Sequence, residues 1–501
     1  MRFLACLLSA CLVFLPRAFA QDTSLPRFGR TEPDPQPPIR SAPLPDLGDA
    51  GSSELTLATE RRIGESIMRE IRRDPSYLDD PEVAEYVNGL GARLTAVAAG
   101  ARQDFEFFVI KDASINAFAL PGGFIGINTG LISVSDSEGE VASVMSHEIA
   151  HVTQRHIARQ IGIQKQMQVP MMIAMAAAIL LGRSRPDLAS GAMAATQGTA
   201  ISSQLAYSRD FEREADRVGF QTLTGAGFDA RSMGEFFEKM QRYTRLQDSG
   251  VVPSYLRSHP VTTERISDAQ SRAEGMPYKQ RADSLEYHLV RAKLRAEAGD
   301  ARDAVRVFTD AVSDRRFANE PGARYGLAVA YLRVKEPKRA EEEIARLRAA
   351  KVASPMVDTL AARARVAQGD PAGALAVLKA AQQRYPYRRS VLYATLATLQ
   401  ELGRYDEVLA TLAEPMRLYP RDPNLFEARA KAYAGQGKRL LQHQALAEVY
   451  FLQGSLPAAI EQLQFAQSSG DGNFYEQSAV DARLKELRSE HQRDMQDAKK
   501  K

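Results

Sequence analysis

The sequence predicts a mainly α-helical protein in which an α+β domain with a small sheet is followed by an α-helical solenoid. Apolar residues recur at helical spacing along most of the chain, which indicates amphipathic helices. Two short runs in the first half are strand-like and account for the small sheet. Glycines and other small residues repeat at a constant period in the second half, which is typical of stacked helix pairs.

Residues 1–20 have the pattern of a secretory signal peptide, with an apolar core that ends in an A-x-A cleavage site at Ala20. This apolar run is too short to form a membrane-spanning helix. The tetrapeptide LSAC, which ends at Cys11, also resembles a lipoprotein box. Lipidation of Cys11 and a membrane anchor therefore stay open as an alternative.

Cleavage after Ala20 removes Cys6 and Cys11, the two cysteines of the chain. Neither a disulfide nor a thiol nucleophile is then expected in the mature protein. The removed segment contains two arginines and no acidic residue, so the formal net charge falls from +3 to about +1. Such a balance gives no support to nucleic-acid binding. Residues 21–52 are rich in proline, and we expect a flexible linker there.

The α+β domain is expected to span residues 53–280. Apolar residues at helical spacing predict its first helix near Ser53 and a second helix around residues 83–94.

Residues 104–110 and 124–132 are the two predicted strands. This region suits an open sheet edge, because an extended substrate can add its backbone to such an edge. Asn116 and the pair Gly122-Gly123 could then face the substrate. A plain hairpin turn explains these residues equally well.

The helix that starts at Glu138, with Ser135 before it at capping-box spacing, carries H-E-x-x-H at His147, Glu148 and His151. Residues four apart lie on one face of a helix, so the two imidazoles can bind one metal ion. Zinc suits two histidines, one carboxylate and a water, whose proton Glu148 can accept as the general base. The alternative is an amphipathic helix with incidental histidines.

A third metal ligand has to come from another segment. A metzincin would need glycine at the position of Gln154, so that class is excluded. The first acidic cluster after the motif is DFEREAD, residues 210–216. On a helix Glu212 and Asp216 lie four apart on one face, whereas Glu214 is expected to point to solvent. Glu212 is therefore the predicted third ligand.

Asp216 lies one helical turn beyond Glu212 and has two candidate roles. Its carboxylate could orient a ligand histidine, or it could donate a proton to the tetrahedral intermediate. An exposed acidic helix without a site is the alternative. His156 lies about half a turn from the face of His147 and is not expected at the site.

Residues 169–182 form an apolar tract that is too short to cross a bilayer. We expect a mobile helical cover over the active site. A surface that contacts membrane or unfolded polypeptide is the alternative.

The second half of the chain has the period of tetratricopeptide repeats, about 34 residues. The period shows in four glycines: Gly299, Gly369, Gly403 and Gly437. The repeat domain is expected over residues 281–490, as a solenoid with a concave binding surface. A shift of the register after Gly437 predicts a non-standard helix pair or a cap, and residues 491–501 are expected to be a flexible tail.

Four segments, in this order along the chain, resemble the gluzincin family of the CAAX-prenyl and HtpX-like proteases. They are NAFALPGGFIGINTGL from Asn116, SHEIAH around His147, EREADRVG from Glu212 and SHP ending at Pro260. Together with the repeats, they resemble the periplasmic members of this family that assist β-barrel assembly.

The resemblance implies one zinc ion bound by His147, His151 and Glu212, with Glu148 as the catalytic glutamate and Asp216 as the proton donor. In similar proteins the histidine of the H-P motif can occupy the open position of the metal. That histidine is His259 here, and it would displace the catalytic water and keep the enzyme latent. Arg265 is a further candidate near the cleft.

The function implied by the resemblance is that of a periplasmic zinc endopeptidase. Its substrates would be misfolded or assembling outer-membrane proteins, and its repeats would dock the β-barrel assembly machinery. The alternative is a non-proteolytic scaffold or chaperone with a latent peptidase site.

Overall fold

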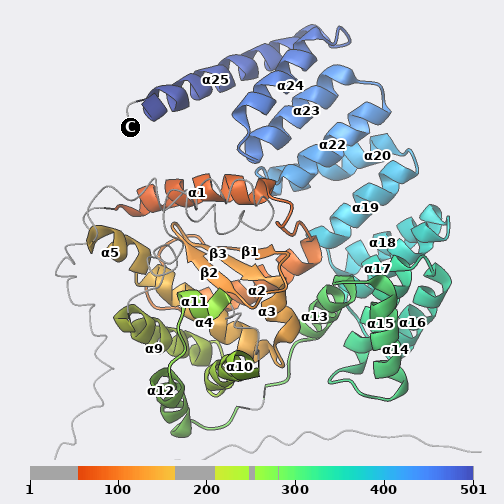
Figure 1. The fold of residues 1–501 in the computed structure, drawn as a ribbon. Coiled ribbons are helices and arrows are strands. Elements are labelled where there is room, and N and C mark those ends of the chain that lie inside the picture. The colour runs from red at the N-terminus through yellow and green to blue at the C-terminus, as the bar shows by residue number, and fades with distance from the viewer. Residues whose placement is uncertain (1–54, 164–208, 247–253, 280, 500–501) are drawn as a thin grey trace, which may run out of the picture. The chain divides into compact units, whose positions relative to one another are not determined.

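The structure is a computed structural model of the chain, and it describes residues 55–163, 209–246, 254–279 and 281–499 (Figure 1). The predicted signal peptide, the proline-rich linker and the apolar tract 169–182 lie outside the described residues. Within the described ranges, no helix combines the length and the hydropathy that crossing a membrane requires.

A three-stranded sheet forms the centre of the first domain. Its strands are β1 (Glu106–Ile110), β2 (Ala117–Leu120) and β3 (Phe124–Asn128), in the order β1-β3-β2. β1 is parallel to β3, and β2 is antiparallel to β3. The first predicted strand is confirmed, whereas the second ends at Asn128, because α3 (Thr129–Val134) follows directly.

Helices cover both faces of this sheet (Figure 1). α1 (Leu57–Arg73) packs on one face, against Phe108 and Ile110 of β1. α2 (Pro81–Thr95) and α4 (Glu138–Thr153) lie on the other face, where Phe107 and Val109 point. Alternate residues of a strand face opposite sides, so a strand buried on both faces reads as one continuous apolar run.

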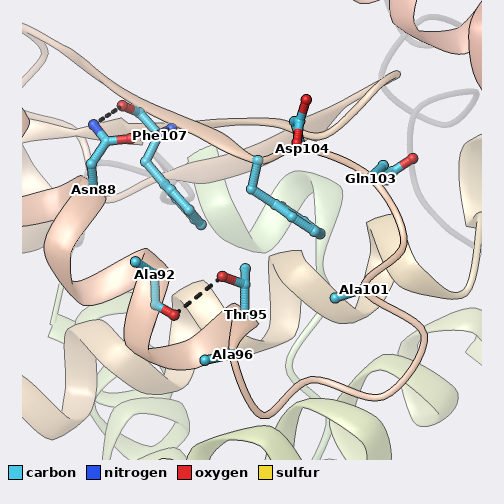
Figure 2. A pocket seen from close by; sticks show the side chains of 9 residues that line it. Asn88, Ala92, Thr95, Ala96, Ala101, Gln103, Asp104 and Phe107 are labelled. Carbon is cyan, nitrogen blue, oxygen red and sulfur yellow. Dashed lines mark hydrogen bonds between the residues drawn. The ribbon is translucent and has the colours of Figure 1, made fainter. Parts of the chain in front are cut away.

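The two outer edges of the sheet differ. Asn88 of α2 closes the β1 edge, since its side chain accepts a hydrogen bond from Phe107 N at 3.1 Å and donates one to Phe107 O at 2.7 Å (Figure 2). Leu78 N donates to Val109 O beside it. The surface pocket drawn in Figure 2 lies at this closed edge and contains none of the predicted metal ligands.

β2 forms the other outer edge of the sheet. The predicted strand at residues 124–132 is β3, which lies in the middle, so the open edge belongs to β2 instead. Asn128 N donates to Asn116 O, and the alternation of an antiparallel pair then turns the backbone groups of Ala117 and Ala119 outward. No backbone group of the described residues bonds to these outward groups.

The pair Gly122-Gly123 forms the turn between β2 and β3, as the hairpin alternative predicts. Both residues have positive φ, 78° and 88°. A Cβ at Gly122 would lie 2.5 Å from the Cα of Arg61, so this turn packs against α1. The expectation that the two glycines face substrate is therefore wrong.

The predicted capping box of α4 is displaced by two residues. The N-cap is Ser137, whose Oγ accepts from Glu140 N at 3.3 Å, and Glu140 in turn accepts from Asp136 N at 2.9 Å. Ser135 donates to Leu131 O and ends α3 instead. Both serines are followed by glutamate at the required spacing, so the pattern alone could not distinguish them.

The remaining described helices of the first domain surround α4 (Figure 1). They are α5 (His156–Ile163), α9 (Arg209–Gly225), α10 (Ser232–Leu246), α11 (Ser254–Ser258) and α12 (Thr263–Glu274). α9 and α10 pack directly on α4.

The second domain consists of antiparallel helices, as predicted. In chain order these are α13 (Leu285–Glu297), α14 (Ala301–Ser313), α15 (Glu320–Arg333), α16 (Pro337–Ala349), α17 (Pro355–Ala367), α18 (Pro371–Arg384), α19 (Arg389–Glu401), α20 (Tyr405–Leu412), α21 (Pro415–Leu418), α22 (Pro423–Gly435), α23 (Arg439–Leu452), α24 (Leu456–Ser468) and α25 (Phe474–Lys499).

The repeat register is visible in the backbone. The four periodic glycines all have positive φ and lie in the turns within helix pairs, and Lys335 takes the same conformation, φ 61°, where the series has no glycine. Five residues after the first four of these turns the chain is buried, at Ala304, Ala340, Ala374 and Val408. The last pair departs from the pattern, because α25 continues to Lys499 through most of the expected flexible tail.

Polar contacts join the repeats to α2 and α4 of the first domain. Lys293 of α13 lies 2.7 Å from Glu82 and 2.5 Å from Asp80, at the start of α2. Thr359 of α17 also donates to Glu82. Ser284, the N-cap of α13, donates to Glu138 at 2.8 Å, so the first residue of α4 is fixed by the repeat domain.

Replacing Lys293 by methionine should lower the free energy of unfolding by about 3–5 kcal/mol, because the buried carboxylate of Glu82 and the half-buried one of Asp80 would lose their cation. Urea denaturation followed by circular dichroism measures the change. The matched control is Arg306→Met, which removes an exposed cation of α14 and should cost about 1 kcal/mol or less. Equal effects of the two substitutions would contradict this account of the interface.

Candidate metal centre

α4 presents the H-E-x-x-H residues to the interior of the first domain. His147, Glu148 and His151 are all buried, with at most 1% of each residue exposed. The Nε2 atoms of the two histidines lie 3.0 Å apart. The predicted helical placement of the motif is therefore confirmed.

α9 brings the predicted third ligand to the same point. Glu212 Oε2 lies 3.5 Å from Nε2 of His147, and Oε1 lies 3.4 Å from Nε2 of His151. The helices can approach closely because Gly219 of α9 lies against α4, where a Cβ would be only 3.0 Å from the Cα of His147. Ala150 of α4 packs against Ala215 and Val218 of α9 in the same contact.

His259 completes the cluster. Its Nδ1 lies 2.9 Å from Glu212 Oε1 and 3.3 Å from Nε2 of His147. The end of α11 fixes its position, since His259 N donates to Tyr255 O at 2.8 Å and its ring stacks on the Tyr255 ring. The ligand atoms of His147, His151, Glu212 and His259 all lie within 4.8 Å of one another.

These residues fit a divalent metal ion. Ligand atoms about 2.0–2.1 Å from a tetrahedral metal lie roughly 3.3 Å apart, close to the separations found between the imidazole and carboxylate atoms here. Glu148 lies beside the cluster, and neither of its buried oxygens has a hydrogen-bond partner among the described residues. A buried carboxylate without a partner is costly, so it indicates a ligand or water at this place.

Asp216 contacts the far side of the first ligand histidine. Its Oδ1 lies 2.9 Å from Nδ1 of His147, and Arg265 donates to both of its oxygens, at 2.6 and 2.8 Å. Burial alone would raise the pKa of Asp216, but the Arg265 guanidinium and the His147 imidazole together outweigh burial and hold this pKa below its ordinary value. Of the two roles considered for Asp216, this geometry favours the orientation of His147 over proton donation.

Arg265, considered only as a residue near the cleft, proves to be central. Arg265 contacts Glu212 as well as Asp216, since its Nη1 lies 2.7 Å from Glu212 Oε2. One buried guanidinium thus pairs with two buried carboxylates of α9. Arg265 lies at the start of α12, which is distant from α9 in the chain. No local sequence pattern therefore indicates that it pairs with the carboxylates of α9.

His156 and Glu214 lie next to the cluster, contrary to expectation. Nδ1 of His156 lies 2.8 Å from Nδ1 of His151, and Nε2 of His156 lies 3.1 Å from Glu214. Glu214 is only half-exposed, and Arg159 also donates to it. The helical-wheel argument that excluded His156 fails because α4 ends at Thr153.

The break between α4 and α5 explains how His156 reaches this place. Arg155 has φ 56°, the left-handed conformation that ends a helix, so the chain changes direction before α5 begins. Burial lowers the pKa of His156 to about 4 and outweighs the opposing charge of Glu214, so the imidazole is neutral near pH 7. The sequence signal that could have indicated it is a third histidine shortly after the motif.

The chain also resembles known protein families and individual proteins. Residues 81–273 match the model of peptidase family M48, and residues 295–364 match that of the tetratricopeptide repeat. The chain is 31% identical over 452 residues to the β-barrel assembly-enhancing protease of Yersinia pestis, covering 90% of this chain and 92% of that protein. It is 39% identical over 306 residues to a Vibrio cholerae protein assigned to the same group, covering 61% of this chain and 63% of that protein.

A more distant relative matches over the peptidase region. The mitochondrial metalloendopeptidase OMA1 of Arabidopsis thaliana is 29% identical over 219 residues, covering 43% of this chain and 41% of that protein.

Replacing Asp216 by asparagine should weaken Zn²⁺ binding roughly 10- to 100-fold, because the charged partner of the His147 imidazole is lost while the side-chain size is kept. Competition with a fluorescent chelator measures the dissociation constant. Asp210→Asn is the matched control, an exposed acid on the same helix that should bind Zn²⁺ like the wild type. Unchanged affinity of the Asp216 variant would show that this carboxylate does not support the metal site.

Proposed function

The chain belongs to peptidase family M48, together with the β-barrel assembly-enhancing proteases, and on that premise we propose that it is a periplasmic zinc endopeptidase of outer-membrane protein assembly. The observation that supports the proposal is the convergence of His147, His151 and Glu212 beside Glu148, a buried carboxylate that makes no hydrogen bond to the described residues. Two imidazoles and one carboxylate are a ligand set of catalytic zinc sites.

Zinc held by His147, His151 and Glu212 would polarise a peptide carbonyl and make a nearby water more acidic. Glu148 accepts the proton of the attacking water as oxygen bonds to the carbonyl carbon. It then returns this proton to the leaving nitrogen as the C–N bond breaks, so each turnover regenerates the carboxylate. Asp216 and Arg265 keep the His147 ring in place throughout.

The open edge of β2 is suited to hold the substrate. An extended segment could pair with the outward backbone groups of Ala117 and Ala119, and Asn116 lies immediately before this strand. β2 packs against α4, the helix that carries the site. Backbone pairing recognises an extended chain and not its side chains, which suits unfolded or unassembled polypeptides as substrates.

His259 is the proposed regulatory element. Its Nδ1 reaches the cluster as closely as the other ligand atoms do, and its Nε2 lies 3.4 Å from Oε1 of the base Glu148. A histidine at this position would compete with water for the fourth place on the metal. Movement of the α11 end would release it and turn a latent enzyme into an active one.

The biological setting is proposed from the names of the relatives and from the sequence. Degradation of misfolded or stalled outer-membrane proteins, and docking of the β-barrel assembly machinery on the repeats, follow from relatives named β-barrel assembly-enhancing proteases. The signal-peptide pattern of residues 1–20 supports the periplasm. The apolar tract 169–182 could add a peripheral contact with the membrane.

A second candidate function rests on the same histidine. If His259 stays on the metal under most conditions, the protein acts chiefly as a scaffold or chaperone through its repeats. The two functions differ in what the loss of Glu148 would do in cells. A protease would lose all of its function, whereas a scaffold would lose only degradation.

Glu148→Gln should abolish peptidase activity, with a loss of at least about 100-fold, because the amide cannot accept the proton of water. Zinc content should stay at one ion per chain, since Glu148 is not among the ligand atoms. Hydrolysis of unfolded casein and elemental analysis test both points. The control is Glu264→Gln, an exposed glutamate of α12. Peptidase activity that survives in Glu148→Gln would rule out the proposed mechanism.

His259→Ala should raise the activity on unfolded casein several-fold, because the fourth position becomes available to water. It should leave zinc bound, since three protein ligands are enough for a catalytic site. Tyr255→Phe serves as the control: it keeps the ring beneath His259 and removes a hydroxyl that has no hydrogen-bond partner among the described residues. A fall in activity together with loss of zinc would mean that His259 is an obligatory ligand and not a latch.

A further inference from the structure

The two ligand histidines of α4 are supported by different groups. Nδ1 of His147 faces the carboxylate of Asp216, the usual partner of a metal-binding imidazole. Nδ1 of His151 faces another imidazole, that of His156, at 2.8 Å. Two imidazole nitrogens this close can form only one kind of hydrogen bond, in which one ring donates and the other accepts.

The direction of this hydrogen bond follows from the position of His151. Its Nε2 points to Glu212 and His147, so this atom has to carry the lone pair that a metal would use. The proton of the neutral ring is then on Nδ1, which donates to Nδ1 of His156. His156 must carry its own proton on Nε2, where Glu214 accepts it at 3.1 Å.

Several contacts fix the orientation of the His156 ring. Its face stacks on Phe211, with ring centres 4.6 Å apart and planes inclined by 11°. Arg159 holds both partners of this ring: it donates to Glu214 at 2.8 Å, and its guanidinium lies over the ring of Phe211. The ring is fully buried, so it cannot turn toward solvent. Such a ring holds one orientation and offers one acceptor to His151.

We infer that His156 is a positioning residue of the metal site: it accepts the Nδ1 proton of His151 and thereby holds Nε2 of that ring toward the metal. The inference rests on the proposed function, since it assigns a role toward the ion of that same site. Glu214 fixes the tautomer of His156, so the motif DFEREAD supplies a metal ligand at Glu212 and one supporting carboxylate for each histidine.

The test compares Zn²⁺ affinity and the absorption spectrum of the Co²⁺-loaded protein, using the full mature chain. Four forms are needed: wild type, His156→Leu, His156→Asn and the control His288→Leu. Asparagine places an amide oxygen where the histidine has Nδ1, so it can still accept from His151. His288 lies in α13, outside the site, and gives the same chemical change without touching it.

His156→Leu should weaken Zn²⁺ binding roughly 10- to 100-fold and alter the Co²⁺ spectrum, because the His151 ring loses its orientation. His156→Asn should recover most of the affinity, and His288→Leu should match the wild type. A folded His156→Leu with wild-type affinity and spectrum would overturn the inference, as would an asparagine variant no better than leucine. A general loss of packing would not be repaired by asparagine.

A second variant keeps the test decisive if His156→Leu does not fold. Glu214→Ala changes a half-exposed side chain and leaves the His156 Nε2 proton without an acceptor, so the tautomer that serves His151 is no longer favoured. A smaller loss of Zn²⁺ affinity supports the inference, and unchanged affinity overturns it. Wild-type protein that binds no stoichiometric zinc would instead refute the proposed function itself.

Discussion

The close crossing of α4 and α9 is the contact on which the site depends. Gly219 lets the two helices meet at backbone distance beside His147, and only then can Glu212 reach both imidazoles of α4. The same crossing turns Glu214 and Asp216 of α9 toward His156 and His147. Burying these carboxylates costs free energy unless each has a partner, and Arg265 and the imidazoles supply those partners.

The repeat domain contributes to the position of α4. Ser284 binds Glu138 at the N-terminus of this helix, and the Tyr287 hydroxyl donates to Ser135 O just before it. Lys293 pairs with the buried Glu82 of α2, a helix that packs on the same sheet face as α4. A partner that displaced the first repeats would therefore act on the helix that carries the site. The contacts give a physical route by which docking on the repeats could influence peptide hydrolysis.

Much of the fold and of the site could be predicted from the sequence, because strong local patterns encode them. His147, His151 and Glu212 follow helical spacing, and the repeats follow their glycine period. The four-residue strand β2 was missed since so short a run has no clear alternation. The roles of His156 and Glu214 were missed because the chain turns at Arg155 between α4 and α5, a residue that makes a tertiary ion pair with Glu60 of α1. Local periodicity cannot indicate such a break.

The proposed function requires that α4 and α9 together bind one catalytic zinc ion. Anomalous diffraction at the zinc absorption edge, on crystals of the mature protein, would locate this ion. We expect a single strong peak between the side chains of His147, His151 and Glu212, within about 2.0–2.2 Å of a ligand atom from each. Zinc bound elsewhere, or no peak in protein crystallised with zinc, would contradict it.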